Sequence, residues 1–575
     1  MERIKTIGLV IDEIFADFSK EIMHSVLYAM RDRKDLRLIV MAGRQCEFDA
    51  DNDDNQHMYK MVYNSIYTME EPCDVDGLIV SLPNLKGVGY ERYKNVPKVF
   101  IASDKKDELT VNYNDEMGLK EALDYLFRVK GITNICMLGG RDDNADAQKR
   151  RMIFMDYLRE KNLDCSADLY EAAGMSTRSE AAATRLLDRN PEAQAVFCVN
   201  DQVAYGLYNV LKKRNKMPGR DIAVFGFDNT RLATDMVPAL ASVGADAASL
   251  GLNALNILLA RMNGEPADPV TIPTCLFGRE SIEYTLEGYS PKDLVNASEA
   301  YIYEMFDTCF YRYRNEIIDS RQIDLRRLYY EIVSKILACT KKRHMNDKQY
   351  EELCRLIDIF FENGAMKYTD VSRFTACTGA FQEALKDVPR SGAVNDKNSA
   401  LFSRMRDKGL LAQASWWIMK NQDYSAERMN INEYIAQTMS FSDEGVSRLD
   451  NALDNFGMLG LEDAALYLYD TPVMFEPGDN MTFPDTINLK CAVVKGEVKR
   501  IPEAEQRTSS ADIFNYEGLA KGGRGQVAFP VFSGLHIYGM LICGLSRDIA
   551  EKGEYIASQI GRVMSMCFDC DRRSV

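Results

Sequence analysis

Short apolar runs alternate with amphipathic stretches over the first half of the chain, most clearly between residues 195 and 230. Residues 195–199 and 222–227 are apolar runs of strand length, which is typical of strands buried on both faces of a parallel sheet. Between them, residues 202–215 carry apolar side chains at helical spacing. Polar residues directly follow both runs. The pattern predicts strand, helix and strand, with polar side chains at the carboxyl end of each strand, where ligands bind in open α/β sheets.

The same alternation extends from residue 4 to about residue 283. Strands are predicted at 6–11, 37–42, 77–82, 98–102, 109–112, 134–138, 169–171, 195–199, 222–227 and 239–243. Helices are predicted between most of them, for example at 18–31, 115–129, 145–161, 178–189 and 247–262. Such alternation favours parallel sheets that helices cover on both faces. A region of this length predicts two such sheets facing each other across a cleft.

The pattern changes after residue 283. Helical periods without strand signals are predicted at 294–315, 324–339, 347–363, 371–385, 398–420 and 426–439. The aromatic-rich faces of these helices indicate a helical core or a dimer interface rather than a cofactor site. Trp416 and Trp417 are adjacent, so one helical face cannot bury both of them. One of them is expected to contact another domain or another subunit.

A mixed α and β pattern begins at residue 441. Helices are predicted at 444–456 and 553–570, and strands at 464–469, 487–494, 525–532 and 535–544. The last two strands predict a hairpin that turns at Ser533-Gly534. These changes of pattern predict three domains: a two-lobed α/β domain over 1–288, a helical connector or dimerisation region over 289–440, and an α+β domain over 441–575.

Composition narrows the classes of function. A chain of 575 residues with a net charge of −16 is expected to form several domains and argues against a general nucleic-acid-binding surface. No apolar run reaches the length of about 18 residues that a membrane span needs. The 14 cysteines show no framework spacing, so we expect reduced thiols in the cytoplasm.

Five segments of the first half carry a resemblance to a known family. They are TIGLVIDEIFADFSKEI, VDGLIV, VNYNDEMGLKEALDYLFRVKGITNICMLGG, KRRMIFMDYL, and the stretch 195–230 followed by PALASVGADAASLGLNALNILL. In this order they resemble the effector-binding domain of LacI/GalR-type regulators, which is similar to periplasmic sugar-binding proteins. The resemblance covers residues 4–283 and implies a two-lobed, periplasmic-binding-protein-like sensor. The order of elements after residue 441 resembles a GAF-type sensor domain.

The sequence also departs from both families. The LacI/GalR regulators begin with a helix-turn-helix, whereas a sensor strand is expected here from residue 4, so no direct nucleic-acid module is expected. The family's Asp-Asn pair after the fifth strand reads Asn114-Asp115, which indicates a different ligand. In GAF-type proteins the last helix commonly continues into an output module. This sequence ends at Val575, so we expect that module to be missing.

The strand-end rule and the resemblance select the same candidate ligand-binding residues. They are Asp12, Phe15, Phe18, Asn114, Arg150, Asn200 and Asp228. Carboxylates and amides bind paired hydroxyls, a guanidinium donates two hydrogen bonds in one plane, and an aromatic ring covers an apolar sugar face. This mixture favours a sugar-like ligand.

Several of these residues have an alternative structural role. Asp201 is expected to be a helix N-cap rather than a ligand contact. Asn200 could be a turn residue, and Asn114 with Asp115 could cap the helix that follows. Phe15 and Phe18 could belong to the core.

Signals for catalysis are poor. The four histidines show no metal-ligand spacing, and no phosphate loop, nucleophile elbow or dinucleotide fingerprint is present. The single C-x-x-C, Cys567 to Cys570, is expected to be a pair of packed thiols. We therefore expect a protein that is not an enzyme and holds no metal or cofactor.

The leading hypothesis is a cytoplasmic, homodimeric sensor without membrane contact that binds a sugar-like molecule in an interlobe cleft. One alternative is a transcription regulator of the LacI/GalR group that acts on DNA through a partner or a missing module. A second alternative is the regulatory part of a cyclic-dinucleotide synthase or kinase.

Overall fold

The computed structural model describes residues 4–44, 54–64, 75–81, 93, 95–103, 105, 107–142, 144–245, 247–284, 289–311, 313, 323–386, 388, 392–438, 448–476, 482–520 and 525–571. The chain forms two compact units. Unit 1 contains residues 1–113, 246–272 and 423–575, and unit 2 contains residues 114–245 and 273–422. The chain therefore passes from one unit to the other after residues 113, 245, 272 and 422.

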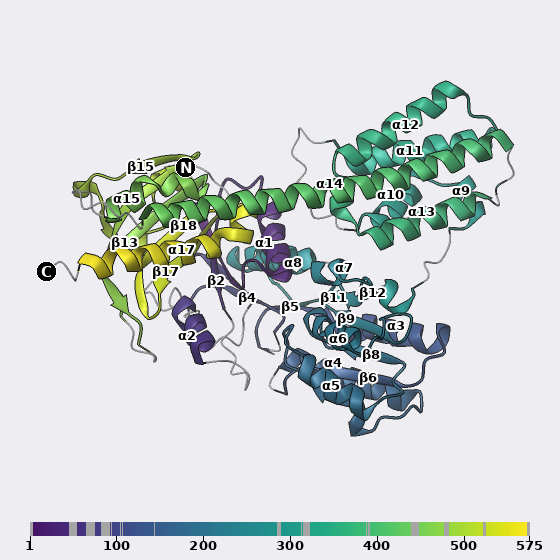
Figure 1. Ribbon diagram of the computed structural model, residues 1–575, viewed down its shortest axis with the longest axis horizontal. Coiled ribbons are helices and arrows are strands. Elements are labelled where there is room, and N and C mark those ends of the chain that lie inside the picture. Colours follow the sequence, from purple (N-terminus) through teal and green to yellow (C-terminus); the bar gives the residue numbers. More distant parts are fainter. Residues whose placement is uncertain are drawn as a thin grey trace. The chain divides into compact units, whose positions relative to one another are not determined.

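Unit 1 is built on a 12-stranded sheet with the order β11-β5-β4-β3-β1-β2-β17-β18-β13-β14-β15, and β16 pairs with β14 (Figure 1). Its strands are β1 (Lys5–Asp12), β2 (Leu36–Gly43), β3 (Gly77–Val80), β4 (Lys98–Ile101), β5 (Thr110–Asn114), β11 (Val270–Pro273), β13 (Asp463–Met474), β14 (Thr486–Val494), β15 (Glu497–Arg500), β16 (Arg507–Ser509), β17 (Gln526–Ser533) and β18 (His536–Gly544).

The N-terminal strands of unit 1 form where apolar runs predicted them. In β1, six consecutive residues from Thr6 to Ile11 are buried, as expected for a strand covered on both faces. Parallel pairing sets Ile7 opposite Leu38 of β2 and opposite Gly77 of β3. This part of the predicted parallel sheet is confirmed.

The strands of the C-terminal region continue the N-terminal sheet. β17 pairs in parallel with β2, with Gln526 opposite Ile39 and Ala528 opposite Met41. β2 would otherwise be an edge with unpaired backbone groups, and β17 covers it. Residues 441–575 are expected from the sequence to be a separate domain, and those boundaries stay a prediction. The compact unit, however, joins these residues to the N-terminal strands.

Helices cover both faces of this sheet. Those of unit 1 are α1 (Asp17–Met30), α2 (Asp54–Tyr63), α8 (Ala247–Met262), α15 (Arg448–Asp454), α16 (Glu517–Ala520) and α17 (Arg547–Asp571). α1 packs on α8, and α17 lies along β17 and β18 (Figure 1). One core combines Val10 and Ile39 of the N-terminal strands with Ala528 and Ile542 of the C-terminal strands. α2 falls in a stretch where no helix is predicted.

Unit 2 contains a 6-stranded sheet with the order β12-β10-β9-β8-β6-β7. Its strands are β6 (Ile135–Gly139), β7 (Tyr170–Ala172), β8 (Ala195–Cys198), β9 (Ala223–Phe227), β10 (Ala241–Gly244) and β12 (Cys275–Phe277). Its covering helices are α3 (Asp115–Asp124), which continues as a π-helical turn (Tyr125–Val129), α4 (Ala145–Glu160), α5 (Glu180–Arg189), α6 (Asp201–Lys213) and α7 (Arg231–Asp235). All pairs except β10–β12 are parallel, so the predicted α/β class is confirmed. β11 of unit 1 and β12 are not predicted.

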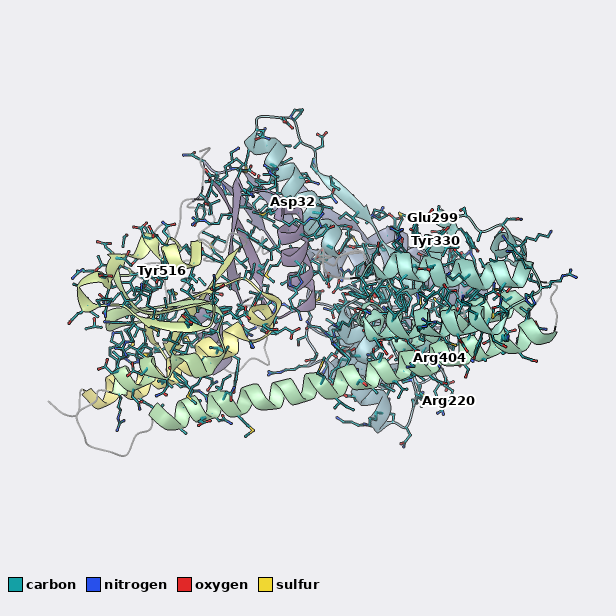
Figure 2. The ribbon with its side chains drawn as sticks, turned by 90° about the horizontal axis from the view of Figure 1, so that it is seen from above. Asp32, Arg220, Glu299, Tyr330, Arg404 and Tyr516 are labelled. Atoms are coloured by element: carbon teal, nitrogen blue, oxygen red, sulfur yellow. The ribbon has the colours of Figure 1, made fainter. Side chains whose placement is uncertain are left out.

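The rest of unit 2 is helical. Its helices are α9 (Pro291–Val295), α10 (Glu299–Cys309), α11 (Leu325–Lys341), α12 (Asp347–Glu362), α13 (Val371–Lys386) and the first part of α14 (Gly392–Thr438). Aromatic rings fill their shared core, with Phe306 and Phe310 stacked at 4.9 Å between centroids. Arg404 of α14, labelled in Figure 2, pairs with Asp358 of α12 at 2.5 Å. The expectation that these aromatic faces form a core is confirmed.

Three predicted boundaries in the helical and C-terminal regions are wrong. The predicted helix 294–315 is two helices, because Ser298 caps a new one: its hydroxyl accepts a hydrogen bond from the amide of Tyr301. Residues 312, 314 and 315 of that prediction lie outside the described residues. The predicted helices 398–420 and 426–439 are one helix of 47 residues, α14. The β17–β18 hairpin turns at Gly534 and Leu535, one residue later than predicted, because Ser533 pairs with His536.

Gly561 permits the close packing of α17 on β17. A Cβ atom at this position would overlap the backbone carbonyl of Phe532. We expect Gly561→Ala to destabilise unit 1 by about 1–3 kcal/mol, because backbone atoms cannot move aside as a flexible side chain can. Gly379 of α13 is the matched control, since nothing lies within 4 Å of its Cβ position. Gly379→Ala should be neutral or stabilising by up to about 1 kcal/mol. Thermal unfolding of both variants tests this, and equal melting temperatures would contradict it.

Candidate ligand-binding site

Arg150 is the centre of the candidate site in unit 2. It lies on α4 and is only 4% exposed. Its Nη1 donates to the carbonyl oxygen of Val199 at 2.8 Å, and its Nη2 donates to Oδ1 of Asp228 at 3.2 Å. The guanidinium carbon lies 3.6 Å from the ring centroid of Phe227. These contacts hold the guanidinium at the carboxyl ends of β8 and β9.

Three carboxylates surround this guanidinium. Besides Asp228, Asp115 places Oδ2 at 4.0 Å from Nε of Arg150 and at 3.3 Å from Nζ of Lys149. Asp146, in the first turn of α4, acts on Arg150 electrostatically. Burial lowers the pKa of the Arg150 guanidinium, but the three carboxylates outweigh burial and raise this pKa above its usual value. Arg150 is therefore charged at every physiological pH.

Burial raises the pKa of two of these carboxyl groups. For Asp228 burial dominates, Arg150 lowers the pKa, and Asp115 raises it further. For Asp146 burial again dominates over the opposing effect of Arg150. Asp146 is not among the residues that the sequence indicated, whereas Asp115 was considered together with Asn114, either at the site or as a helix cap. Their signal was their position in the first turns of α3 and α4, which follow strand ends.

Asp228 lies in a turn with an unusual backbone. Asp228 and the next residue, Asn229, have φ angles of 93° and 50°, in the left-handed region. The backbone amide of Asp228 donates to the carbonyl of Val243 at 2.8 Å, and that of Asn229 donates to the hydroxyl of Ser242 at 3.0 Å. The side chain of Asp228 is 25% exposed, and its Oδ2 accepts no hydrogen bond from the described residues. Arg150 thus fixes one carboxylate oxygen, and none of the residues that the structure describes donates to the other.

Asp201 stabilises this turn through hydrogen bonds. Its Oδ2 accepts hydrogen bonds from the amide and the hydroxyl of Thr230 at 2.8 and 2.9 Å, and its Oδ1 accepts one from the hydroxyl of Ser242 at 2.7 Å. Asp201 is fully buried. Burial, followed by the nearby charge of Asp228, raises the pKa of Asp201 to about 7.

The two predicted asparagines are both helix N-caps. Oδ1 of Asn200 accepts from the amide of Val203 at 2.9 Å, and its Nδ2 donates to the carbonyl of Met175 at 3.1 Å. The expectation that Asp201 caps this helix is therefore wrong, because Asn200 precedes the first turn and Asp201 lies inside it. Asn114 caps α3 by accepting from the amide of Met117 at 3.3 Å. Ligand contact by either asparagine stays a prediction.

The remaining predicted residues lie in unit 1, at the carboxyl end of β1. Asp12 is the last residue of β1, and its backbone carbonyl accepts a hydrogen bond from the hydroxyl of Ser19. Phe15 is 40% exposed, and its ring centroid lies 5.1 Å from the guanidinium carbon of Arg44. Phe18 is half-buried in the first turn of α1. Phe15 is thus placed on the surface rather than in the core, and its contact with a ligand stays a prediction.

Arg44 connects this strand edge to the C-terminal part of unit 1. Its Nη1 lies 3.2 Å from Oε1 of Glu13, and its Nη2 pairs with Oε1 of Glu554 on α17. The hydroxyl of Tyr59 donates to the same oxygen of Glu554 at 3.2 Å. Burial lowers the pKa of Arg44, but Glu554 and Glu13 raise it overall. Arg44 is not among the residues predicted from the sequence.

Comparisons with known proteins agree with this fold. Residues 125–282 match the family model of the periplasmic binding protein-like domain. The chain is similar to the HTH-type transcriptional repressor PurR of Aliivibrio salmonicida, with 25% identity over 265 residues, 45% of this chain and 75% of that protein. It is 31% identical over 196 residues to PurR of Vibrio campbellii, which is 33% of this chain and 58% of that protein, less than two thirds of its length.

Solved structures of regulators also match about half of the chain. The transcriptional regulator CelR in complex with cellobiose is 23% identical and covers 49% of this chain and 85% of its own, with a TM-score of 0.40. The transcription regulator CcpA of Lactococcus lactis is 21% identical and covers 49% of this chain and 100% of its own, with a TM-score of 0.41.

These findings define the class of the N-terminal region. Residues 125–282 form an α/β region that matches the periplasmic binding protein-like domain, and the chain is similar to repressors named PurR. The curated relatives are transcriptional regulators and not enzymes, in agreement with the prediction from the sequence. They are named HTH-type, so they do not support the expectation of a protein without a DNA-binding module. No helix among the described residues is long and apolar enough to cross a membrane.

The raised pKa of Asp201 predicts a pH-dependent stability of unit 2. In the unfolded chain the pKa returns to about 3.8, so the folded state holds the proton more tightly between pH 4 and 7. Asp201 therefore contributes stability below about pH 4 that is lost as the pH rises through about 7. We expect the unfolding free energy of Asp201→Asn, relative to that of the parent protein, to rise over this pH range by at most about 4 kcal/mol. Melting temperatures of both proteins at each pH measure this difference. A constant difference from pH 4 to pH 8 would contradict the assignment.

Proposed function

We propose that this chain is a ligand-responsive regulator that binds a small polyhydroxylated molecule, a sugar or sugar derivative, at Arg150 and Asp228. The observation that carries the proposal is the state of the Asp228 carboxylate. Arg150 fixes one oxygen, and the other oxygen has no hydrogen-bond donor among the described residues although the side chain is partly exposed. A fixed carboxylate with a free oxygen is suited to accept a hydrogen bond from a hydroxyl group.

The surrounding charges support a neutral or cationic ligand over an anion. Asp115, Asp146 and Asp228 face one guanidinium, so an anionic ligand would meet more negative than positive charge. Each hydroxyl of a neutral polyol can both donate and accept a hydrogen bond. Such a ligand can therefore donate to the carboxylates and accept from Lys149 or Arg150. The contribution of Asp12, Phe15 and Phe18 to binding remains a prediction.

A second candidate function is transcription regulation. The curated relatives are named as transcriptional repressors, which supports a role in regulating genes. The proposal includes a homodimer that works in the cytoplasm and responds to its effector. A mobility-shift assay with genomic fragments, with and without the bound sugar, tests it. Loss or gain of a shifted band on addition of the sugar would support it, and the absence of any shifted band would contradict it.

Calorimetric titration with a panel of neutral mono- and disaccharides and nucleosides tests the ligand site. We expect Asp228→Ala to weaken the binding of the panel member that binds by about tenfold or more, because the variant loses a charged acceptor. The matched control is Asp188→Asn, which removes the negative charge of an exposed ion pair, Arg214–Asp188, in the same unit. Its affinity should equal that of the parent protein.

Two results would overturn this assignment. If no compound of the panel binds to protein that unfolds cooperatively, the ligand class is wrong. If a compound binds and Asp228→Ala leaves its dissociation constant unchanged, the site is wrong.

A further inference from the structure

The turn at Asp228 contacts the helical region of unit 2 as well as the candidate site. Asp228 is bound to Arg150 on one side. The next residue, Asn229, accepts a hydrogen bond at its Oδ1 from Nη2 of Arg279 at 2.5 Å. Both residues of the turn have left-handed φ angles. Because such a backbone has few alternative conformations, a displacement of Asp228 must also displace Asn229.

Arg279 connects this turn to the start of α13 and the end of α10. It is 5% exposed, and its Nη1 donates to the carbonyl of Leu240 at 2.7 Å. Its Nε lies 3.7 Å from Oδ2 of Asp370, and its Nη2 lies 3.5 Å from the hydroxyl of Tyr311. The Tyr311 hydroxyl donates to Oδ2 of Asp370 at 3.2 Å. Arg279, Asp370 and Tyr311 therefore share one network, in which Arg279 and Asp370 are buried and Tyr311 is half-buried.

Asp370 directly precedes α13. Its Oδ1 accepts a hydrogen bond from the backbone amide of Arg373 at 2.8 Å, which is the geometry of a helix N-cap. Ser372 donates to Oε1 of Glu280 at 2.6 Å, which is a second bond between α13 and the segment that carries Arg279. A change in the position of Arg279 therefore acts on the first turn of α13.

A second contact joins the turn to α14. Thr230 precedes α7, and Arg231 is the first residue of that helix. The guanidinium carbon of Arg231 lies 5.0 Å from the ring of Trp416 on α14. Trp416 and its neighbour Trp417 are the two tryptophans of the chain. The tryptophan fluorescence of this protein therefore reports on α14 close to the turn.

We propose that the turn Asp228–Arg231 and Arg279 form a relay that transmits occupation of the candidate site to α13 and α14. The inference rests on the proposed function, since it assigns a role to the same Asp228. A ligand that donates a hydrogen bond to Oδ2 of Asp228 draws the carboxylate toward itself and weakens the hydrogen bond from Arg150. The turn then shifts and Asn229 moves with it. Arg279 follows Asn229, because a buried guanidinium that loses an acceptor is strongly unfavourable. The pair Arg279–Asp370 moves with it and changes the first turn of α13.

The first test needs no ligand. In the full chain, Asp228→Asn weakens the bond to Arg150 and mimics a change at the site. We expect hydrogen exchange of the amides of residues 370–374 to change by about fivefold or more, together with a shift of the tryptophan emission maximum. Asp188→Asn is the control and should change neither quantity. If Asp228→Asn also leaves both unchanged, the relay does not exist.

The second variant pair tests the path through Arg279. Arg279→Lys keeps the positive charge but loses the planar fork that binds Asn229 and Asp370 together. Tyr311→Phe removes the hydroxyl that bridges Arg279 and Asp370 and leaves only their direct ion pair at 3.7 Å. In either background, the effect of Asp228→Asn on exchange at residues 370–374 should disappear or fall by about fivefold. If Arg279→Lys fails to fold cooperatively, Tyr311→Phe alone decides. An undiminished effect in the folded background would overturn the path.

The third test uses the sugar that binds in calorimetry. Its titration should shift tryptophan emission and change hydrogen exchange at residues 370–374 in the parent protein. In Arg279→Lys or Tyr311→Phe the exchange effect should disappear or fall by about fivefold, although calorimetry still detects binding to both variants. Binding without a fluorescence change in the parent protein would contradict the relay and leave the ligand site in place. A failure of all sugars to bind would contradict the proposed function, and the ligand-free comparison would still decide on the relay.

Discussion

The structure of unit 2 depends on a constraint that buried guanidinium groups impose. An arginine side chain has five N–H donors and cannot give up its charge, so burial requires acceptors around the whole group. Arg150 and Arg279 are both about 95% buried, and the turn Asp228–Asn229 lies between them and supplies an acceptor to each. The backbone of this turn is left-handed at both residues. It presents two consecutive side-chain oxygens to two arginines that approach from different elements.

A corresponding arrangement exists in unit 1 around Arg44. Its acceptors come from Glu13, which follows β1, and from Glu554 on α17. An N-terminal strand end and a C-terminal helix therefore share one largely buried charge. The parallel pairing of β17 with β2 strengthens this connection, because it extends the N-terminal sheet without a break into the C-terminal strands. In unit 1, Arg44 follows β2 and binds Glu554 of α17. In unit 2, Arg279 follows β12 and pairs with Asp370, which precedes α13. Both partners lie outside the α/β pattern of residues 4–283.

Local patterns in the sequence predicted most strands and helices, since these depend on the periodicity of nearby residues. The run at 195–199 and the helix that starts at Asp201 are examples. The pairing of Gln526 with Ile39 was not predictable in this way, because it joins positions nearly the whole chain apart and any uncovered edge strand could have accepted β17. The single helix α14 was missed because polar residues near 421–425 interrupt the apolar spacing on which the prediction relied.

The candidate site could likewise be predicted only where a local sequence pattern indicated it. Asp228 was predicted from a strand end and Arg150 from the family resemblance, and the structure brings them into contact. Asn200 and Asp201 could not be told apart, because both are good N-caps and only the position of the first turn assigns the role to Asn200. Asp115 and Asp146 contribute to the site because their charges interact with Arg150 in the folded structure. Arg279 had no local signal, because its partners Asn229, Leu240, Tyr311 and Asp370 are far from it along the sequence.

The position of α14 bears on the proposed relay. α14 begins among the helices of unit 2 and continues into unit 1, so the chain connects the units through a helix as well as through the three passages in the α/β region. An α-helix transmits displacement along its axis because each residue is bonded to the next turn. Arg231 contacts this helix at Trp416, and it follows closely on the turn that carries Asp228 and Asn229. A change at one carboxylate of unit 2 therefore has a short covalent and packed route to the helix that both units share.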